Sequence, residues 1–178
     1  VIVNIYNQYM TNGTTNIALF NDGLYSNVIR NAYNQNTYGA MIGYYDTFFK
    51  VWETSVDITA SHVNLKPIID EIPKVNANAL SYSLNNTISL NNQKTHFVIL
   101  NWRHYLPYYY GATKLEDQME FSAGYKSNFY DNRLQISLIA NDLFKTLRND
   151  GYTLYSGYRE SFRQYNDHRR VTLSVTYS

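Results

Sequence analysis

The sequence predicts an all-β protein, a transmembrane antiparallel β-barrel in which about eight long strands are visible. Three features predict this class: a hydrophobic period of two along most of the chain, connections that alternate between short and long, and an unusual composition. The 178 residues include 19 Tyr and 8 Phe, whereas charged residues make up 16%, below the roughly 25% of an average soluble domain. Tyrosine suits a membrane interface, because its ring lies among acyl chains while its hydroxyl reaches the headgroups.

The alternation is clearest at the C-terminus. One face there is apolar and consists of Val171, Leu173, Val175 and Tyr177. The intervening residues are Thr172, Ser174 and Thr176. Similar runs occupy 52–60, 80–90, 119–126 and 134–141. A tilted strand crosses a bilayer in about 9–11 residues, with one face toward lipid and the other toward the lumen. A soluble barrel with buried aromatic residues is the alternative, but its outer face should carry charge.

The alternation and its interruptions predict these strands: 1–20, 24–48, 50–63, 77–91, 94–109, 117–130, 132–147 and 165–178. Residues 152–160 would extend the seventh of them. The segment 65–75 is expected to be a loop because it holds two prolines. Asp142 would fall on the apolar face of the seventh strand, so a bulge or the end of the apolar band is expected there.

The connections assign the two ends of the barrel. Very tight turns are predicted at Phe48–Val51, Asn91–Lys94 and Tyr130–Arg133, all at the end that also holds the C-terminus. Longer links fall at the opposite end, at 21–23, 64–76, 111–118 and 149–167. In bacterial membrane barrels the short turns are periplasmic and the long loops extracellular. The long links are therefore expected to face the cell exterior.

The C-terminal block resembles a known family. Residues 132–138 (Asn-Arg-Leu-Gln-Ile-Ser-Leu), then Asn141-Asp142-Leu143-Phe144, a Tyr-rich link and residues 167–177 carry the resemblance. In this order they are similar to the penultimate strand, the Asn-Asp-x-Phe motif and the terminal strand of TonB-dependent receptor barrels. The most similar group is the outer-membrane β-barrel family common in Bacteroidetes, so the resemblance implies a Gram-negative outer membrane.

The resemblance implies a barrel of about twenty-two strands with a plug inside it. Residues 1–178 would then be one outer-membrane β-barrel domain, the last eight strands of a longer polypeptide whose plug and TonB box lie outside this chain. The alternative is that eight strands close on themselves as a small barrel. The partners implied are outer-membrane lipid, the barrel-assembly machinery, and TonB acting through the plug. Leu173, Val175 and Tyr177 would form the terminal-strand assembly signal.

Three groups of residues are candidates for function. Glu53, Asp57 and Glu120 share the predicted lumen face and would line a solute path or contact a plug, although a wide barrel needs such a polar lining in any case. Arg169 shares the parity of Val171 near the outer headgroups and is a candidate contact for lipopolysaccharide phosphate. The predicted extracellular loops hold Tyr108, Tyr109, Tyr110, Tyr158 and Arg159. Aromatic loops suit the capture of a sugar or peptide, although a position at the membrane interface explains these tyrosines equally well.

Composition and motifs argue against other classes. A net charge of +1 argues against a nucleic-acid partner, and the absence of Cys excludes cysteine chemistry. The pair Asp167-His168 lies at a rim, but adjacent strand residues point to opposite faces, so we expect no enzyme activity, cofactor or metal. The sequence favours a TonB-dependent nutrient transporter; the alternative is a scaffolding barrel in a larger complex for secretion or with a surface lipoprotein.

Overall fold

The computed structural model describes residues 1–21, 23–155 and 158–178, with the backbone alone described at positions 20, 21, 25 and 158. The chain forms an antiparallel sheet of eight strands in the order β1-β2-β3-β4-β5-β8-β9-β12. Their bounds are β1 Ile2–Asn21, β2 Leu24–Phe48, β3 Trp52–Pro67, β4 Val75–Ser89, β5 His96–Tyr105, β8 Gln118–Phe129, β9 Leu134–Asn141 and β12 Arg170–Tyr177. Among the described residues, no helix is long and apolar enough to cross a membrane.

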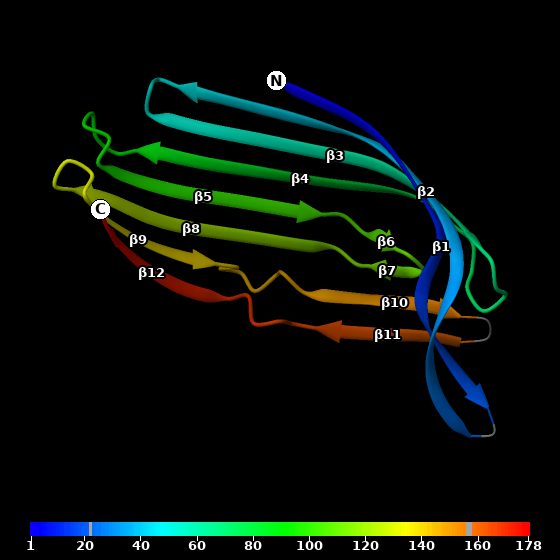
Figure 1. Cartoon of the computed structure of the whole chain (residues 1–178). Coiled ribbons are helices and arrows are strands. Elements are labelled where there is room, and N and C mark those ends of the chain that lie inside the picture. The colour runs from blue at the N-terminus through cyan, green and yellow to red at the C-terminus, as the bar shows by residue number, and fades with distance from the viewer. Residues whose placement is uncertain (22, 156–157) are drawn as a thin grey trace.

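A second sheet of four short strands continues the large one at the end opposite the tight turns (Figure 1). Its order is β11-β10-β7-β6, with bounds β6 Tyr108–Tyr110, β7 Thr113–Leu115, β10 Asn149–Tyr155 and β11 Tyr158–Gln164. The far half of the β1–β2 hairpin bends across this sheet (Figure 1). We call this end of the molecule the lobe; among the described residues it comprises 13–21, 23–33, 65–75 and the small sheet with its connections.

The large sheet is an open trough. β1 and β12 stand first and last in its order and are not paired with each other, so the eight strands do not close into a small barrel. The outer edges of both strands are unpaired within the described chain. This openness leaves room for further strands on either side.

The predicted strands are confirmed for the large sheet, with four corrections. The last predicted strand, 165–178, begins only at Arg170. The predicted strand 94–109 is interrupted after Tyr105, because Pro107 has no N–H to donate and β6 begins only at Tyr108. The predicted strand 132–147 ends at Asn141, since Asp142 has a φ of 47°. The segment 152–160 does not extend the seventh strand: 152–155 belong to β10 and 158–160 to β11, and 156 and 157 lie outside the described residues. The 65–75 loop is also shorter than predicted, because β3 continues to Pro67 and β4 begins at Val75.

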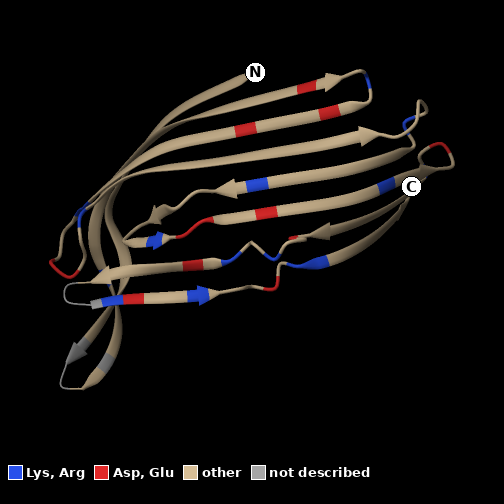
Figure 2. Cartoon of the chain, turned by 180° about the vertical axis from the view of Figure 1, so that it is seen from behind, with Lys and Arg blue, Asp and Glu red and all other residues tan. Residues whose placement is uncertain are grey.

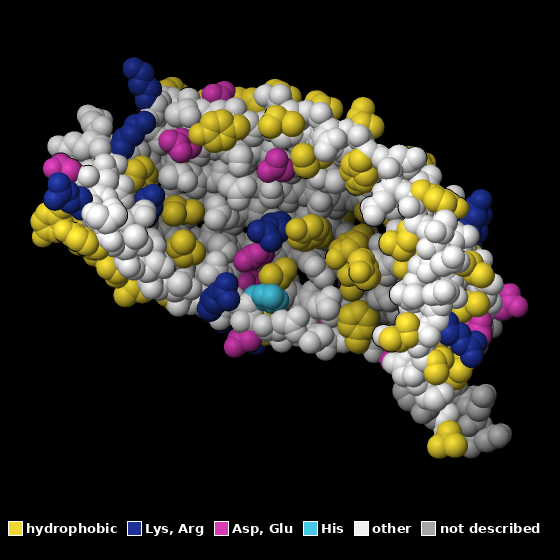
Figure 3. Space-filling model, viewed as in Figure 1, with side chains coloured by type: hydrophobic (Ala, Val, Ile, Leu, Met, Phe, Trp, Pro, Cys, Tyr) yellow, Lys and Arg dark blue, Asp and Glu magenta, His cyan; other side chains and the backbone are white. Residues whose placement is uncertain are grey.

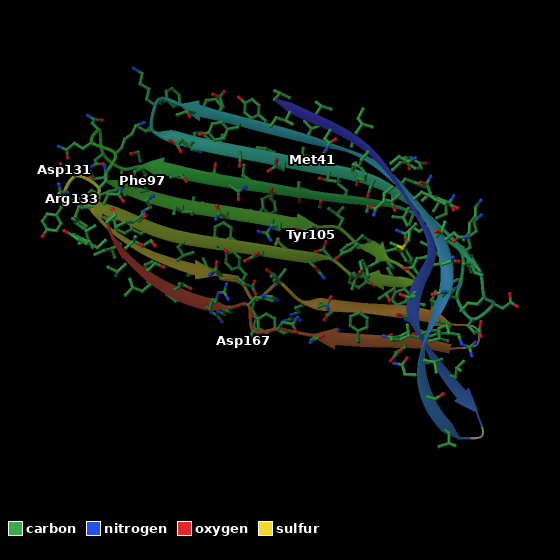
Figure 4. All side chains as sticks on the ribbon, viewed as in Figure 1. Met41, Phe97, Tyr105, Asp131, Arg133 and Asp167 are labelled. Carbon is green, nitrogen blue, oxygen red and sulfur yellow. The ribbon has the colours of Figure 1, made fainter. Side chains whose placement is uncertain are left out.

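All three tight turns are confirmed. In each, the N–H of the last residue donates to the carbonyl of the first at 3.1 Å, from Val51 to Phe48, from Lys94 to Asn91 and from Arg133 to Tyr130. Asp131 and Asn132 both have positive φ, as a two-residue hairpin turn of the mirror-image type requires. Figure 4 places Asp131 and Arg133 at the same end as the C-terminus, and Asp167 between β11 and β12.

The two faces of the sheet differ as the alternation predicts. On β12, the outward-facing side chains are apolar. Val171 and Tyr177 among them remain 68% and 72% exposed, because nothing in the described chain covers them. Acidic and basic side chains instead gather in the hollow of the trough (Figure 3). Along the ribbon, the strands of the large sheet carry few charged positions, and most charges lie at the turns and the lobe (Figure 2). Register places Val56, Leu84 and Trp102 side by side on the convex face, which therefore has the character of a lipid-facing wall.

The hydrophobic core lies in the lobe rather than in the middle of the trough. Its buried members come from both long hairpins, the 68–74 loop and the small sheet: Ile17, Ala32, Tyr33, Leu65, Ile72, Val75 and Ala112. Tyr33 packs its ring onto Gly13, at a register shift where Asn12 has a φ of 54°. The glycine leaves room for the ring at the point where the β1–β2 hairpin bends toward the small sheet.

We expect Gly13→Ala to lower the free energy of unfolding by about 1–3 kcal/mol. A Cβ at this position would lie 2.5 Å from a carbon of the Tyr33 ring, so the ring would have to leave its site in the core. Urea unfolding of the protein in detergent micelles measures the change. The double variant Gly13→Ala/Tyr33→Leu should lose less stability than the sum of the single changes; a strictly additive result would contradict the packing explanation.

Candidate functional site

The trough holds a row of polar side chains drawn from four strands. Pairing places Asp57 of β3 opposite Ser83 of β4, Ser83 opposite Arg103 of β5, and Arg103 opposite Glu120 of β8. The Ser83 hydroxyl donates to Asp57 at 3.4 Å, and an Arg103 guanidinium nitrogen lies 3.9 Å from a Glu120 carboxylate oxygen. Two of the predicted lumen residues thus share one row, and Glu53 lies four residues from it along β3 on the same face.

Sequence reasoning missed Arg103, the cation of this row. The stretch Phe97–Leu100 is apolar on both faces, so it does not indicate which residues of β5 face the lumen. The signal lay in the next residues, since Asn101, Arg103 and Tyr105 alternate with Trp102 and His104. Figure 4 shows Met41, Phe97 and Tyr105 along the same trough.

A cleft of about 410 Å³ opens in the lobe between the β1–β2 hairpin and the small sheet. Hydroxyl, amide and aromatic side chains dominate its lining, which includes Thr14, Asn16, Tyr33, Tyr110, Thr153 and Glu160. The Tyr155 hydroxyl donates to the Asn16 carbonyl at 3.2 Å, and the hydroxyls of Thr113 and Thr153 lie 2.7 Å apart. The Tyr155 bond joins the two walls of the cleft, whereas the threonine pair joins β7 and β10 within one wall.

The predicted loop residues have different positions in the lobe. Tyr110 lines the cleft and is 78% exposed, whereas Tyr109 packs against the hydrophobic core. Tyr108 lies beside Tyr105, with 6.3 Å between ring centroids, and Arg159 holds its guanidinium 3.7 Å above the Tyr152 ring. The side chain of Tyr158 lies outside the part that the structure describes. Of the four predicted residues whose side chains are described, the structure therefore brings only Tyr110 into the cleft.

Burial sets the protonation of the lobe tyrosines. It raises the pKa of Tyr33, with a further increase from the neighbouring Tyr110, and it also raises the pKa of Tyr109. Both phenols therefore keep their protons at neutral and mildly alkaline pH. Each remains a hydrogen-bond donor in the lobe.

Asp142 joins the large sheet to the lobe. Its carboxylate is fully buried and accepts hydrogen bonds from the N–H groups of Thr146 (2.8 Å) and Leu147 (3.2 Å), and from the Tyr165 hydroxyl (3.0 Å). The Tyr165 oxygen in turn accepts the N–H of Arg169 at 2.8 Å. One carboxylate thus links the end of β9, the 142–147 segment and the approach to β12. From the sequence alone, Asp142 could be recognised only as a residue that interrupts the alternation of apolar and polar side chains.

The other predicted positions lie around β12. Arg169 is exposed and directly precedes the strand, so its predicted contact with lipopolysaccharide phosphate stays a prediction. Asp167 has a φ of 51°, and the ring of His168 meets that of Tyr165 edge-on at 6.4 Å. Three apolar residues of β12 lie opposite apolar residues of β9, namely Leu173 opposite Leu138, Val175 opposite Ile136 and Tyr177 opposite Leu134.

Comparison with known proteins agrees with this architecture. Residues 1–177 match the model of the outer membrane protein beta-barrel family. No curated protein matches the chain, and neither does any solved structure. Long antiparallel strands, tight turns at one end and an uncovered apolar convex face are the features that a wall in lipid requires. The chain therefore belongs to the outer membrane protein β-barrel family, and the bacterial outer membrane is where its wall resides.

Proposed function

We propose that this chain is the lipid-embedded wall of a TonB-dependent receptor-like transporter for a bulky nutrient. The observation that carries the proposal is the open sheet, in which the outer edges of β1 and β12 have no partner strand within the described chain. Backbone groups left unpaired in lipid cost several kcal/mol each. Both edges therefore call for further strands, and a barrel of about twenty-two strands has a lumen wide enough to need a plug.

The trough is the surface that faces such a plug. Asp57, Arg103 and Glu120 offer charges of both signs along one row, and Glu53 adds a carboxylate nearer the periplasmic turns. A plug or a passing solute with complementary charges would make hydrogen bonds here. The cleft in the lobe, at the end with the long connections, would be the first part of this chain to meet a nutrient.

The remaining partners follow from the same assignment. TonB would act from the periplasm through a plug outside this chain, and the barrel-assembly machinery would read Leu173, Val175 and Tyr177 on the terminal strand. Arg169, at the outer end of β12, would contact lipopolysaccharide phosphate. The similarity of the last residues to TonB-dependent receptors of Bacteroidetes supports this assignment.

A scaffolding barrel in a larger outer-membrane complex is the second candidate. It is favoured by a polar row on the convex face, formed by Asp46, Thr54 and Asn86 on three adjacent strands. Asn86 accepts hydrogen bonds from the Trp52 indole and the Thr54 hydroxyl, each at 2.9 Å. A carboxylate and an amide on a lipid-facing surface suit contact with another protein.

We expect the intact protein to bind the periplasmic domain of TonB. Site-specific crosslinking in cells, followed by mass spectrometry of the product, measures this contact. A crosslinked TonB adduct, together with an intact mass well above the 20.8 kDa of this chain, is the expected result. Stable copurification with a lipoprotein or secretion component, without any TonB adduct, would contradict transport and favour the scaffold.

A further inference from the structure

A bounded groove lies on the convex face of the sheet, near the lobe. It is a shallow depression, open on its outer side, with a volume of about 780 Å³. Its floor is formed by Ala40 of β2 and Ala60 of β3, which are direct partners in the ladder. Two small side chains side by side leave a depression where the neighbouring rows carry larger ones.

Larger side chains surround this floor. The pair Ile42–Ile58 borders it toward the periplasmic turns, and the rings of Tyr38 and His62, 5.0 Å apart, border it toward the lobe. Ile5 closes one flank, and Leu80 and Leu106 close the other. The groove therefore has the shape and apolar surface that a hydrocarbon chain requires.

The end of the groove toward the lobe is polar. His62 Nδ1 lies 2.7 Å from the Asn78 side-chain oxygen. The next row toward the lobe is made of three paired asparagines, Asn36, Asn64 and Asn76. Among the described residues, the side-chain oxygens of Asn36 and Asn64 are buried within this row and have no hydrogen-bond partner. Beyond them Lys66 is exposed, with Asn34 as its ladder partner.

We propose that this groove binds an acyl chain of lipopolysaccharide, while the asparagine row and Lys66 contact its phosphorylated sugar. The convex face of an outer-membrane wall meets lipid, and the groove lies toward the end with the long connections, which places it in the outer leaflet. An amphiphile of that leaflet has its chains toward the midplane and its headgroup outward. The groove has the same order, with its apolar floor toward the midplane and its polar end outward. Lipopolysaccharide supplies the phosphate that the exposed Lys66 would bind, and its sugar would lie against the polar surface of the asparagine row.

A bounded site is needed to hold one particular lipid. Lipid tails are as apolar as leucine, so a smooth apolar wall gains little from exchanging one lipid for another. Close van der Waals fit and directed hydrogen bonds supply the difference. The proposal depends on the location of the wall in the outer membrane and not on its role in transport.

The test is the lipopolysaccharide that copurifies with the intact protein from its own outer membrane in mild detergent. Ala60→Phe fills the floor of the groove, and we expect it to lower the amount of lipopolysaccharide per protein by at least about fivefold, as a loss of roughly 1 kcal/mol would. Mass spectrometry of the bound lipids measures this quantity. Lys66→Gln, an exposed change that leaves the fold alone, should lower it as well.

Ala140→Phe is the matched control. Ala140 pairs with Ala123 on the same convex face, but neither residue lines the groove, so lipopolysaccharide content should stay at the unmodified level. Equal lipopolysaccharide in all variants would overturn the proposal. Two other results would also overturn it, because the groove would then hold another occupant. One is a selective loss of phospholipid from Ala60→Phe. The other is a change from dimer to monomer with unchanged lipopolysaccharide.

Discussion

Leu84→Arg is expected to lower the free energy of unfolding by about 2–4 kcal/mol, the cost of a cation near the midplane on the lipid face of a membrane barrel. Leu84 lies in the middle of β4, with Val56 and Trp102 as its ladder partners on the convex face. The arginine would lie among acyl chains, too far from either headgroup layer for a fully hydrated position. Urea titration in phospholipid vesicles, followed by the shift in gel mobility between folded and unfolded barrel, measures the difference.

Asn85→Arg is the matched control for this change. Asn85 is the next residue on the same strand, on the trough face, with Ser55 and Asn101 as ladder partners. An arginine there would extend into an aqueous lumen, so stability should change by less than about 0.5 kcal/mol, as for an ordinary surface substitution. Equal effects at positions 84 and 85 would show that the two faces have been assigned wrongly.

Asp142→Ala is expected to have an effect of similar size through a different cause. The change leaves the N–H groups of Thr146 and Leu147 without their acceptor in a buried site, at about 1–3 kcal/mol for each unsatisfied group. It also releases the Tyr165 hydroxyl. We expect a loss of roughly 3 kcal/mol in total, together with faster proteolysis of the 142–169 segment by an externally added protease.

Asp142→Asn separates the hydrogen bonds from the charge. The amide oxygen can still accept both backbone N–H groups, so this variant should keep more than half of the stability that the alanine variant loses. Asp70→Ala, in an exposed part of the loop after β3, is the control for loss of a carboxylate. If Asp142→Asn is as unstable as Asp142→Ala, the charge rather than the acceptor geometry holds the segment.

The large sheet could be predicted because lipid imposes a simple rule on each strand. Side chains alternate with a period of two, so one lipid-facing residue such as Leu173 fixes the face of every other residue in β12. The tight turns were equally accessible, because a hairpin of two central residues leaves the chain no other place to reverse. Glu53, Asp57 and Glu120 could therefore be assigned to the lumen face from alternation alone.

The lobe could not be predicted in the same way. Its strands β6 and β7 are each three residues long, too short for a period to be recognised, and the pairing of β7 with β10 joins segments far apart in sequence. Pro107 and Asp142 were visible as interruptions, but where the chain goes after each interruption depends on partners elsewhere. Tyr110 lines the cleft and Tyr109 packs against the core, because adjacent residues of β6 point to opposite sides of the small sheet.

The sequence by itself determined the class of this protein, its long strands, their two faces and the end at which the tight turns lie. These properties are local, since each depends on alternation or on a few neighbouring residues. Only the tertiary structure decided that the sheet stays open, that Arg103 joins Asp57 and Glu120 in one row, and that Ala40 and Ala60 meet to form a groove. Those features depend on strand register, which matches residues across strands and is set by the packing of whole hairpins rather than by any single segment.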